Sequence, residues 1–327
     1  MQSPKITNGP IVLLTSVGLI AMLAAYFLPI WWVALTAPNY PKDAFPDGIR
    51  IHFHMNGVFN GCKAAPGGSR LQKEVLQHDI EEKTERYNPI LDKDKDVNKG
   101  AEGLDCVHEM NTINHYVGMF PIETGAPVER PLAKFFFAFF ATLMVAFAVP
   151  SAKGRLAALG VGFAAVAAWM LVDLYALGSH DRFVVNYMNE AGAFFKEPEK
   201  IAGWAGMLRK ATSVAVGALI AAMAVLLLLV WKRPASALLL ALVPALLPLY
   251  FLVDYAGWLW FFGHNLHPWG AFTVKPFMPT VFGEGKVAQF STYSYPYWGY
   301  ALLVLVFLAL VLALLVRRRQ WREQAPG

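Results

Sequence analysis

The sequence predicts an all-α integral membrane protein with six transmembrane helices. Hydrophobic residues make up 56% of the 327 residues and charged residues only 16%, which is more apolar than a soluble domain of this length normally is. The apolar residues also gather in long runs, and a helix needs roughly 20 residues to cross about 30 Å of hydrocarbon. Six runs have that length: 10–36, 132–151, 156–178, 211–231, 235–258 and 297–316.

The polar segments between these runs predict the domain organisation. The first run is expected to remain as an anchor, because its apolar stretch is too long for a signal peptide and lacks a small-residue cleavage site. The second run is the weakest, since Lys134 interrupts it. The predicted parts are an anchor at 1–36, an extracytoplasmic loop domain at 37–131, a five-helix membrane region at 132–316 with outer loops 179–210 and 259–296, and a basic tail at 317–327.

The distribution of charge predicts the orientation. With six spans, the N-terminus, two short turns and the tail lie on one side of the membrane, and they carry nine Lys and Arg against one acid, Glu323. Their net charge is therefore +8, and the rest of the chain is −3, because the whole chain is +5. Positive short loops mark the cytoplasmic face, so we expect a bacterial inner-membrane protein with both termini in the cytoplasm. The basic pI is then explained by the positive charge of the cytoplasmic segments, and nucleic acid is not an expected partner.

The predicted outer segments hold both cysteines and every histidine. Cys62 and Cys106 share the large loop, where an oxidising compartment makes a disulfide the expected state. Closing a loop of that length stabilises the fold by about 4 kcal/mol in the chain-entropy model. The intervening residues, 63–103, are rich in charge and turn formers and are expected to be solvated. The histidines are His52, His54, His78, His108, His115, His180, His264 and His267.

The segment 105–119 predicts a short helix with a ligand-bearing face. Asp105 is suited to cap its start. At about 100° per residue, His108, His115 and Met119 share one face, whereas Cys106 lies on the other. Cys106 is then free to bond Cys62 while the opposite face meets a common partner.

Imidazole and thioether groups without a required thiolate favour copper over zinc, calcium or magnesium. His108, His115 and Met119 are the principal predicted copper ligands, and His52, His54 and Met55 are the supporting ones. In a strand, His52 and His54 share a face and Met55 takes the other. The alternative is a folded loop whose histidines bond locally and whose methionines pack. Other metals, haem contacts and quinone-type ligands also stay open, although no Cys-x-x-Cys-His motif is present.

Two helical hairpins form a possible tandem repeat with an offset of about 80 residues. The third run contains Leu171-Val-Asp173 and the fifth contains Leu252-Val-Asp254, each followed by a loop with a histidine. A pseudo-two-fold axis along the membrane normal is then possible. Asp173 and Asp254 both lie about 27–32 Å from the basic turns, near the outer interface and level with Lys134. These three residues predict an interfacial polar network, which explains the acids without transport.

The last outer segment is aromatic and proline-rich, as expected of an interfacial belt. His264 and His267 lie in it at i, i+3 and, with His180, are possible pocket-lining residues near the large-loop site. No phosphate loop, dinucleotide fingerprint, nucleophile elbow or His-Glu-x-x-His motif is present, so no catalytic residues are predicted.

Two strings carry a weak resemblance to known proteins. Met110-Asn-Thr-Ile-Asn-His-Tyr-Val-Gly-Met119 and Val274-Lys-Pro-Phe-Met-Pro279 resemble uncharacterised bacterial membrane proteins associated with copper-dependent respiration, in particular with nitrous oxide reductase assembly. The resemblance covers little of the chain. It implies an accessory role in copper delivery to, or maturation of, a periplasmic metalloenzyme.

The sequence therefore predicts a membrane-anchored copper-binding accessory protein, with copper as its cofactor and the lipid bilayer and a periplasmic metalloenzyme or respiratory complex as its partners. A metal-free structural subunit or assembly factor of such a complex is the first alternative. A small-solute permease, favoured by the repeat, is the second.

Overall fold

The computed structural model describes residues 8–40, 42–62, 105–195, 197–268, 270–271, 273–287 and 289–324. The predicted solvated excursion at 63–103, with His78, lies outside these ranges.

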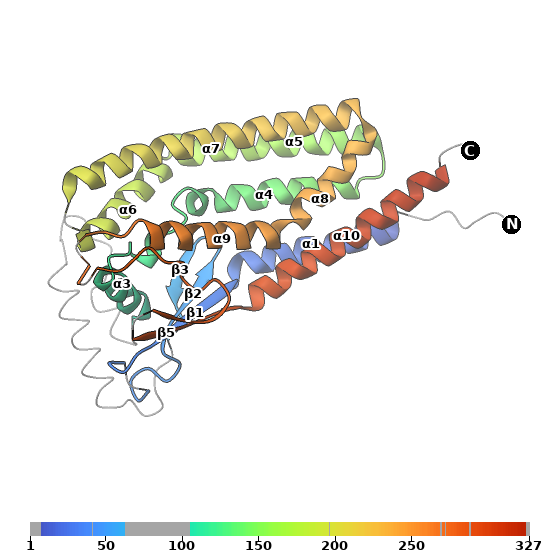
Figure 1. Ribbon diagram of the computed structural model, residues 1–327. Coiled ribbons are helices and arrows are strands. Elements are labelled where there is room, and N and C mark those ends of the chain that lie inside the picture. The colour runs from blue at the N-terminus through green and yellow to red at the C-terminus, as the bar shows by residue number, and fades with distance from the viewer. Residues whose placement is uncertain are drawn as a thin grey trace.

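The described chain is mostly helical and has the helices of a membrane protein (Figure 1). Five helices are long and apolar enough to cross a bilayer, and a sixth crossing results if one bent pair counts as a single span. The five are α1 (Gly9–Phe27), α4 (Glu129–Ala148), α5 (Ala152–Leu171), α7 (Pro198–Lys232) and α10 (Trp298–Gln324); the bent pair is α8 (Leu239–Ala245) and α9 (Leu247–His264).

The prediction of an all-α fold is wrong, because a five-stranded antiparallel sheet covers one end of the bundle (Figure 1). Its order is β3-β2-β1-β5-β4, so the central pair joins the start of the chain to its end. The residues after Phe27 continue the apolar run but form a strand instead of extending the first helix to 36. The strands are β1 (Trp31–Thr36), β2 (Ile49–His54), β3 (Gly57–Asn60), β4 (Gly283–Val287) and β5 (Phe290–Pro296).

Short helical elements lie at both ends of the bundle, and most of them lie at the sheet-bearing end. The outer loop predicted at 179–210 is helical, since it comprises α6 and the first turns of α7. The predicted hairpins also differ in shape: α5 runs on into a π-helical turn, whereas α8 and α9 meet at an angle of 49°. The short elements are α3 (Cys106–Tyr116), η2 (Ile122–Thr124), η3 (Val172–Ala176), α6 (Ser179–Phe195) and η4 (Pro234–Leu238).

Buried polar contacts fix the sheet against α9. Ser294 of β5 is fully buried and its hydroxyl accepts a hydrogen bond from Trp31 Nε1 (2.8 Å) and lies 3.3 Å from the Tyr255 hydroxyl of α9. Around these groups, Ile49 and Ile51 of β2 pack with α3 and α9 in one apolar core. The sheet therefore rests directly on α9 around Tyr255 and Leu259.

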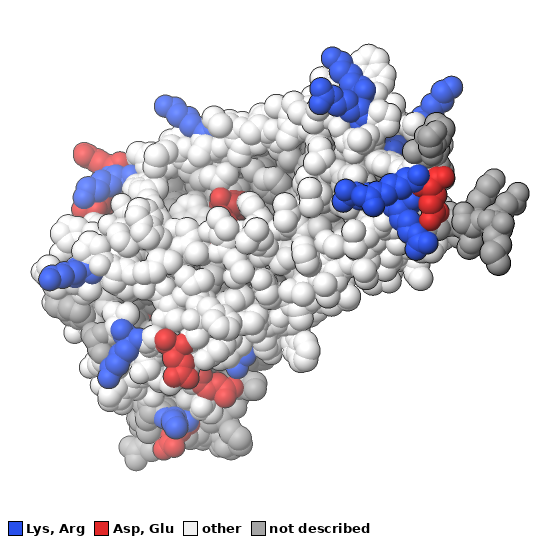
Figure 2. Space-filling view, turned by 45° about the vertical axis from the view of Figure 1, so that its right-hand side comes forward, with Lys and Arg blue, Asp and Glu red and all other residues white. Residues whose placement is uncertain are grey.

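On the face shown in Figure 2, most charged side chains lie toward the two ends of the molecule. Lys and Arg gather at the end that carries both termini, and a broad belt with few charges separates them from charges of both signs at the sheet-bearing end. Within that belt, Figure 2 shows acidic atoms in a hollow of the surface.

Candidate functional site

The predicted disulfide is present. Cys62, just after β3, is bonded to Cys106 at the start of α3, with the two Cα atoms 5.9 Å apart. Asp105 caps α3 as expected, because its carboxylate accepts the His108 backbone N–H at 3.1 Å. The disulfide that the sequence predicts therefore holds α3 against a sheet that it does not predict.

The predicted ligand face of α3 is only partly formed. His108 and His115 are half-buried and lie away from the apolar core that Cys106, Met110 and Ile113 enter. Met119 does not join them, because α3 ends at Tyr116 and Gly118 turns the chain with φ +82°. Its side chain is 5% exposed and packs beside Phe262 of α9. Met119 therefore lies beyond the helix and does not share a helical face with His108 and His115.

The supporting copper ligands are also dispersed. His52 stacks on Tyr297 with 5.2 Å between ring centroids, and its Nε2 accepts a hydrogen bond from Arg50 Nε (3.2 Å). His54 packs edge-on against Phe59, and burial lowers its pKa, while Met55 packs against the core formed by α1 and α10. Within the described ranges, no three His, Cys, Asp or Glu side chains come together as a metal site.

The predicted interfacial network divides into two parts. Lys134 of α4 and Asp173 of η3 form an ion pair with an Nζ–Oδ2 distance of 2.7 Å, and the Ser179 hydroxyl donates to the same oxygen at 2.6 Å. Asp254 is not their partner and instead faces Glu129, the first residue of α4. Only the Lys134–Asp173 part of the predicted network is therefore present.

The three remaining histidines lie in different surroundings. His180 is 4% exposed, and burial lowers its pKa. His264 is exposed and stacks on Trp260, whereas His267 Nε2 lies 2.8 Å from Glu197 Oε2. None of the three lines either of the cavities described next.

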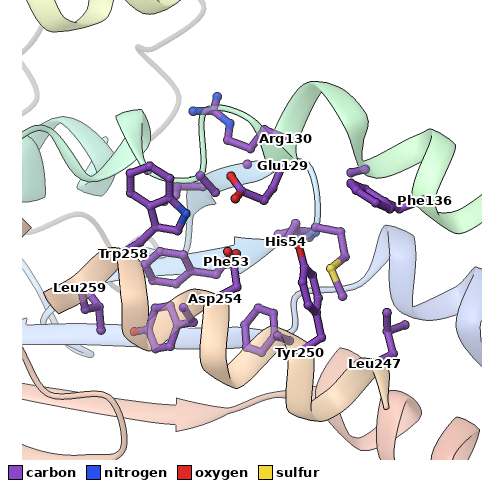
Figure 3. Close-up of a pocket in the computed structure, with 18 of the residues that line it drawn as sticks. Phe53, His54, Glu129, Arg130, Phe136, Leu247, Tyr250, Asp254, Trp258 and Leu259 are labelled. Carbon is purple, nitrogen blue, oxygen red and sulfur yellow. The ribbon is translucent and has the colours of Figure 1, made fainter. Parts of the chain in front are cut away.

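A cavity lies below the sheet, between the first turns of α4 and the middle of α9 (Figure 3). It encloses about 930 Å³ including its open side. Phe53 and His54 close it from β2, Phe136 and other aromatic residues line it from α4, and Tyr250 and Trp258 line it from α9. We call it the aromatic pocket.

Two carboxyl groups face each other inside the aromatic pocket. Glu129 and Asp254 point toward one another, and the Trp258 indole lies beside them (Figure 3). Glu129 Oε2 is buried and has no hydrogen-bond partner among the described residues. The start of a helix favours an acid such as Glu129, but Asp254 lies ten residues before the end of α9, about 15 Å along its axis. Position in α9 therefore gives Asp254 no comparable stabilisation.

A second cavity adjoins the aromatic pocket, and a layer of shared side chains separates the two. Phe53, Ile122, Tyr255 and Leu259 border both cavities. The second cavity lies between the sheet and α3, and Met110, Met119 and Phe290 are among its mostly apolar lining residues. An elongated ligand that displaced part of this layer would occupy both spaces.

The sequence predicts Asp254 at the membrane interface but does not single out Glu129. The available signal was that Glu129 directly precedes an apolar run, at the same end of the bundle as Asp173 and Asp254. Asp254 comes to lie opposite Glu129 because the chain bends before α9. Hydrophobic periodicity predicts the helices but not the angle between them.

Comparison of the chain with protein-family models, with curated proteins and with solved structures gave no match.

Proposed function

We propose that this protein binds an amphipathic molecule in the aromatic pocket at the outer face of the membrane. Glu129 and Asp254 receive its polar, hydrogen-donating head, and the aromatic walls receive its apolar body. The single observation that carries the proposal is a pair of facing carboxyl groups inside a mostly apolar pocket, also lined by His54 and Arg130, that lies beneath the five-stranded sheet.

The chemistry of the lining favours an amine or hydroxyl head. Facing carboxyl groups supply acceptors and negative charge but repel an anion, and buried carboxyl groups gain from a donor that pairs with them. Trp258, Tyr250 and Phe136 offer aromatic faces, which attract cations. Ligand pockets commonly combine an apolar lining with a few convergent polar groups in this way.

Binding of matched single-chain probes tests the proposal. The protein is placed in nanodiscs of zwitterionic lipid, and its melting temperature is followed with dodecylamine, dodecanol and dodecanoate. We expect the amine and the alcohol to stabilise the protein and the carboxylate to have no such effect. Asp254→Asn should weaken amine binding at least about tenfold, the loss of one charge-assisted hydrogen bond.

Glu284→Gln is the matched control, since this exposed acid on β4 lies outside the aromatic pocket. Its affinity for dodecylamine should equal that of the unmodified chain. Equal stabilisation by dodecylamine and dodecanoate, or undiminished amine binding by Asp254→Asn, would reject the aromatic pocket as the head-group site.

For the location, we propose the bacterial inner membrane with the sheet outside and both termini in the cytoplasm. The supporting observations are the excess of Lys and Arg at the end with the termini (Figure 2) and the disulfide at the opposite end, because cytoplasmic loops are positive and disulfides persist in oxidising compartments.

Copper handling stays a prediction of the sequence. The described donors do not support a copper site, since His52, His54, Met55 and Met119 have separate packing partners. Loading the purified protein with Cu(I) tests the hypothesis directly. A stoichiometry that falls in a triple His108→Ala, His115→Ala, Met119→Ala variant would support it, and an unchanged stoichiometry would reject these ligands.

A further inference from the structure

Two arginines are buried together at the basic end of the bundle, far from the aromatic pocket. Arg155, in the first turn of α5, is 5% exposed, and Arg317, near the end of α10, is 4% exposed. Burial of an arginine is costly unless its charge and its donors find partners. We therefore examine which groups balance the charge and accept the hydrogen bonds of these two side chains.

Both guanidinium groups bond the carbonyls that end α4. Arg317 Nη2 donates to the Phe147 carbonyl (2.9 Å), and Arg155 Nη2 donates to the carbonyls of Val149 (3.1 Å) and Pro150 (3.4 Å). These bonds satisfy carbonyl groups that a helix end leaves open. Part of the role of each arginine is thus to cap α4.

Capping does not account for all the charge or all the donors. A helix end supplies about half a negative charge, against two full positive charges here. Within the described part of the chain, neither arginine pairs with a carboxylate, and the Nε of each is buried without a hydrogen-bond partner. The acid of the same segment, Glu323, pairs with Arg319 instead, at 3.0 Å.

We infer that Arg155 and Arg317 form a binding site for a phosphate group. Phosphate oxygens are acceptors that match guanidinium donors, and basic sites between transmembrane helices recognise anionic lipid headgroups. The small exposed fraction of both side chains restricts the ligand to a compact group. The phosphate of an anionic lipid and free inorganic phosphate share this chemistry.

The experiment measures the melting temperature of the full chain in a neutral detergent. The probes are dioleoylphosphatidylglycerol, dioleoylglycerol, which has the same chains without phosphate, and sodium phosphate against sodium chloride at equal ionic strength. We expect dioleoylphosphatidylglycerol to raise the melting temperature by several degrees and dioleoylglycerol to leave it unchanged. A similar rise with sodium phosphate alone would support the site with free phosphate as its source.

A pair of double variants assigns the effect to the buried arginines. Arg155→Gln with Arg317→Gln removes both charges but keeps amide donors near the α4 carbonyls, and the phosphate effect should disappear. Lys153→Gln with Arg318→Gln removes the same charge from exposed neighbours and should keep the effect. The inference is overturned if the variant with Arg155→Gln and Arg317→Gln keeps the phosphate effect. It is also overturned if neither phosphate probe raises the melting temperature of the unmodified chain.

Hydrogen exchange on the unmodified chain covers the case in which the buried variant does not fold. Bound dioleoylphosphatidylglycerol should slow exchange at the two ends that meet here, around 149–155 and 315–320, relative to dioleoylglycerol. Equal exchange with both lipids would overturn the inference without any substitution.

Discussion

Aspartates at matching sequence positions have different partners in the fold. Asp173 is paired with Lys134 at 2.7 Å and remains partly accessible, whereas Asp254 faces another acid inside an aromatic pocket. The ion pair with Lys134 is enough to explain why an acid lies at position 173. An acid beside an acid is a stronger indication of function, because only a ligand or a shared proton relieves the repulsion.

Asp173→Asn should therefore cost little. The Lys134 and Asp173 side chains are 35% and 18% exposed, and ion pairs of this accessibility contribute less than about 1 kcal/mol. A double-mutant cycle with Lys134→Met, read by thermal unfolding in detergent, measures the coupling. A coupling of several kcal/mol would show that the pair is more deeply desolvated than its accessibility indicates.

Glu123 should make stability depend on pH. Burial, followed by the nearby Glu190 and Asp105, raises the pKa of Glu123 from 4.5 to about 7. The folded chain then holds a proton that the unfolded chain releases between these values, so this group lowers stability as the pH rises from 4.5 to 7. At pH 8, Glu123→Gln should be more stable than the unmodified chain by up to about 3 kcal/mol.

Unfolding followed from pH 4.5 to 8.5 checks this sign. The advantage of Glu123→Gln should vanish at the acid end, and the exposed control Glu284→Gln should show no such trend. A difference that grows toward low pH would contradict the assignment.

At the scale of elements, the angle between α8 and α9 positions Asp254. Pro248 has no N–H to offer the Pro244 carbonyl four residues earlier, and its ring clashes with that carbonyl in a straight helix. The helices meet here at 49°. Pro248 lies six residues before Asp254, and we expect the shape of the aromatic pocket to depend on this bend.

Pro248→Ala should straighten this pair. With 1.5 Å rise per residue, spin labels at Ala235 and His264 should move apart by about 3–4 Å if the bend is lost, and dodecylamine binding should weaken as Asp254 leaves Glu129. Pulsed electron resonance measures the distance, and Pro234→Ala, outside the bend, is the control. An unchanged distance would show that packing, rather than Pro248, imposes the angle.

Loss of the disulfide should separate α3 from the sheet. Cys62 and Cys106 are 44 residues apart, so replacing both with serine should lower the free energy of unfolding by about 4 kcal/mol. Chemical unfolding with and without a reductant measures the effect. The double variant should be insensitive to the reductant, and equal stability of the two chains would contradict this role.

The helices were more predictable than the strands for physical reasons. Long apolar runs predict α5 and α10 directly, because nothing else buries such segments. Trp31–Thr36 continues an apolar run, and an unbroken apolar run does not distinguish a strand from a helix. The segment 283–296, which forms β4 and β5, has a composition that also suits an interfacial belt. The sequence predicts that Lys134 and Asp173 lie at the same level of the bundle, and the two side chains form an ion pair. Predicting that Asp254 faces Glu129 would have required knowledge of the bend before α9.

For the whole molecule, the charge at its two ends predicts a single orientation. Cysteines introduced at exposed positions in intact cells should react with a membrane-impermeant maleimide at Glu284 and only after permeabilisation at Lys153 and Arg319. The native cysteines are disulfide-bonded and give no background. Labelling of Lys153→Cys in intact cells would reverse the proposed topology.

The pairing of β1 with β5 sets the order of events during synthesis. Trp31 contacts Ser294, 263 residues later, and at 5–20 residues per second the ribosome needs roughly 13–50 s to make the intervening chain. Throughout that interval β1 has an unpaired edge, which is a hazard for aggregation. The sheet is therefore completed only when translation is nearly over, and a chain that stopped before Phe290 would present an unpaired β1 edge to the quality-control machinery.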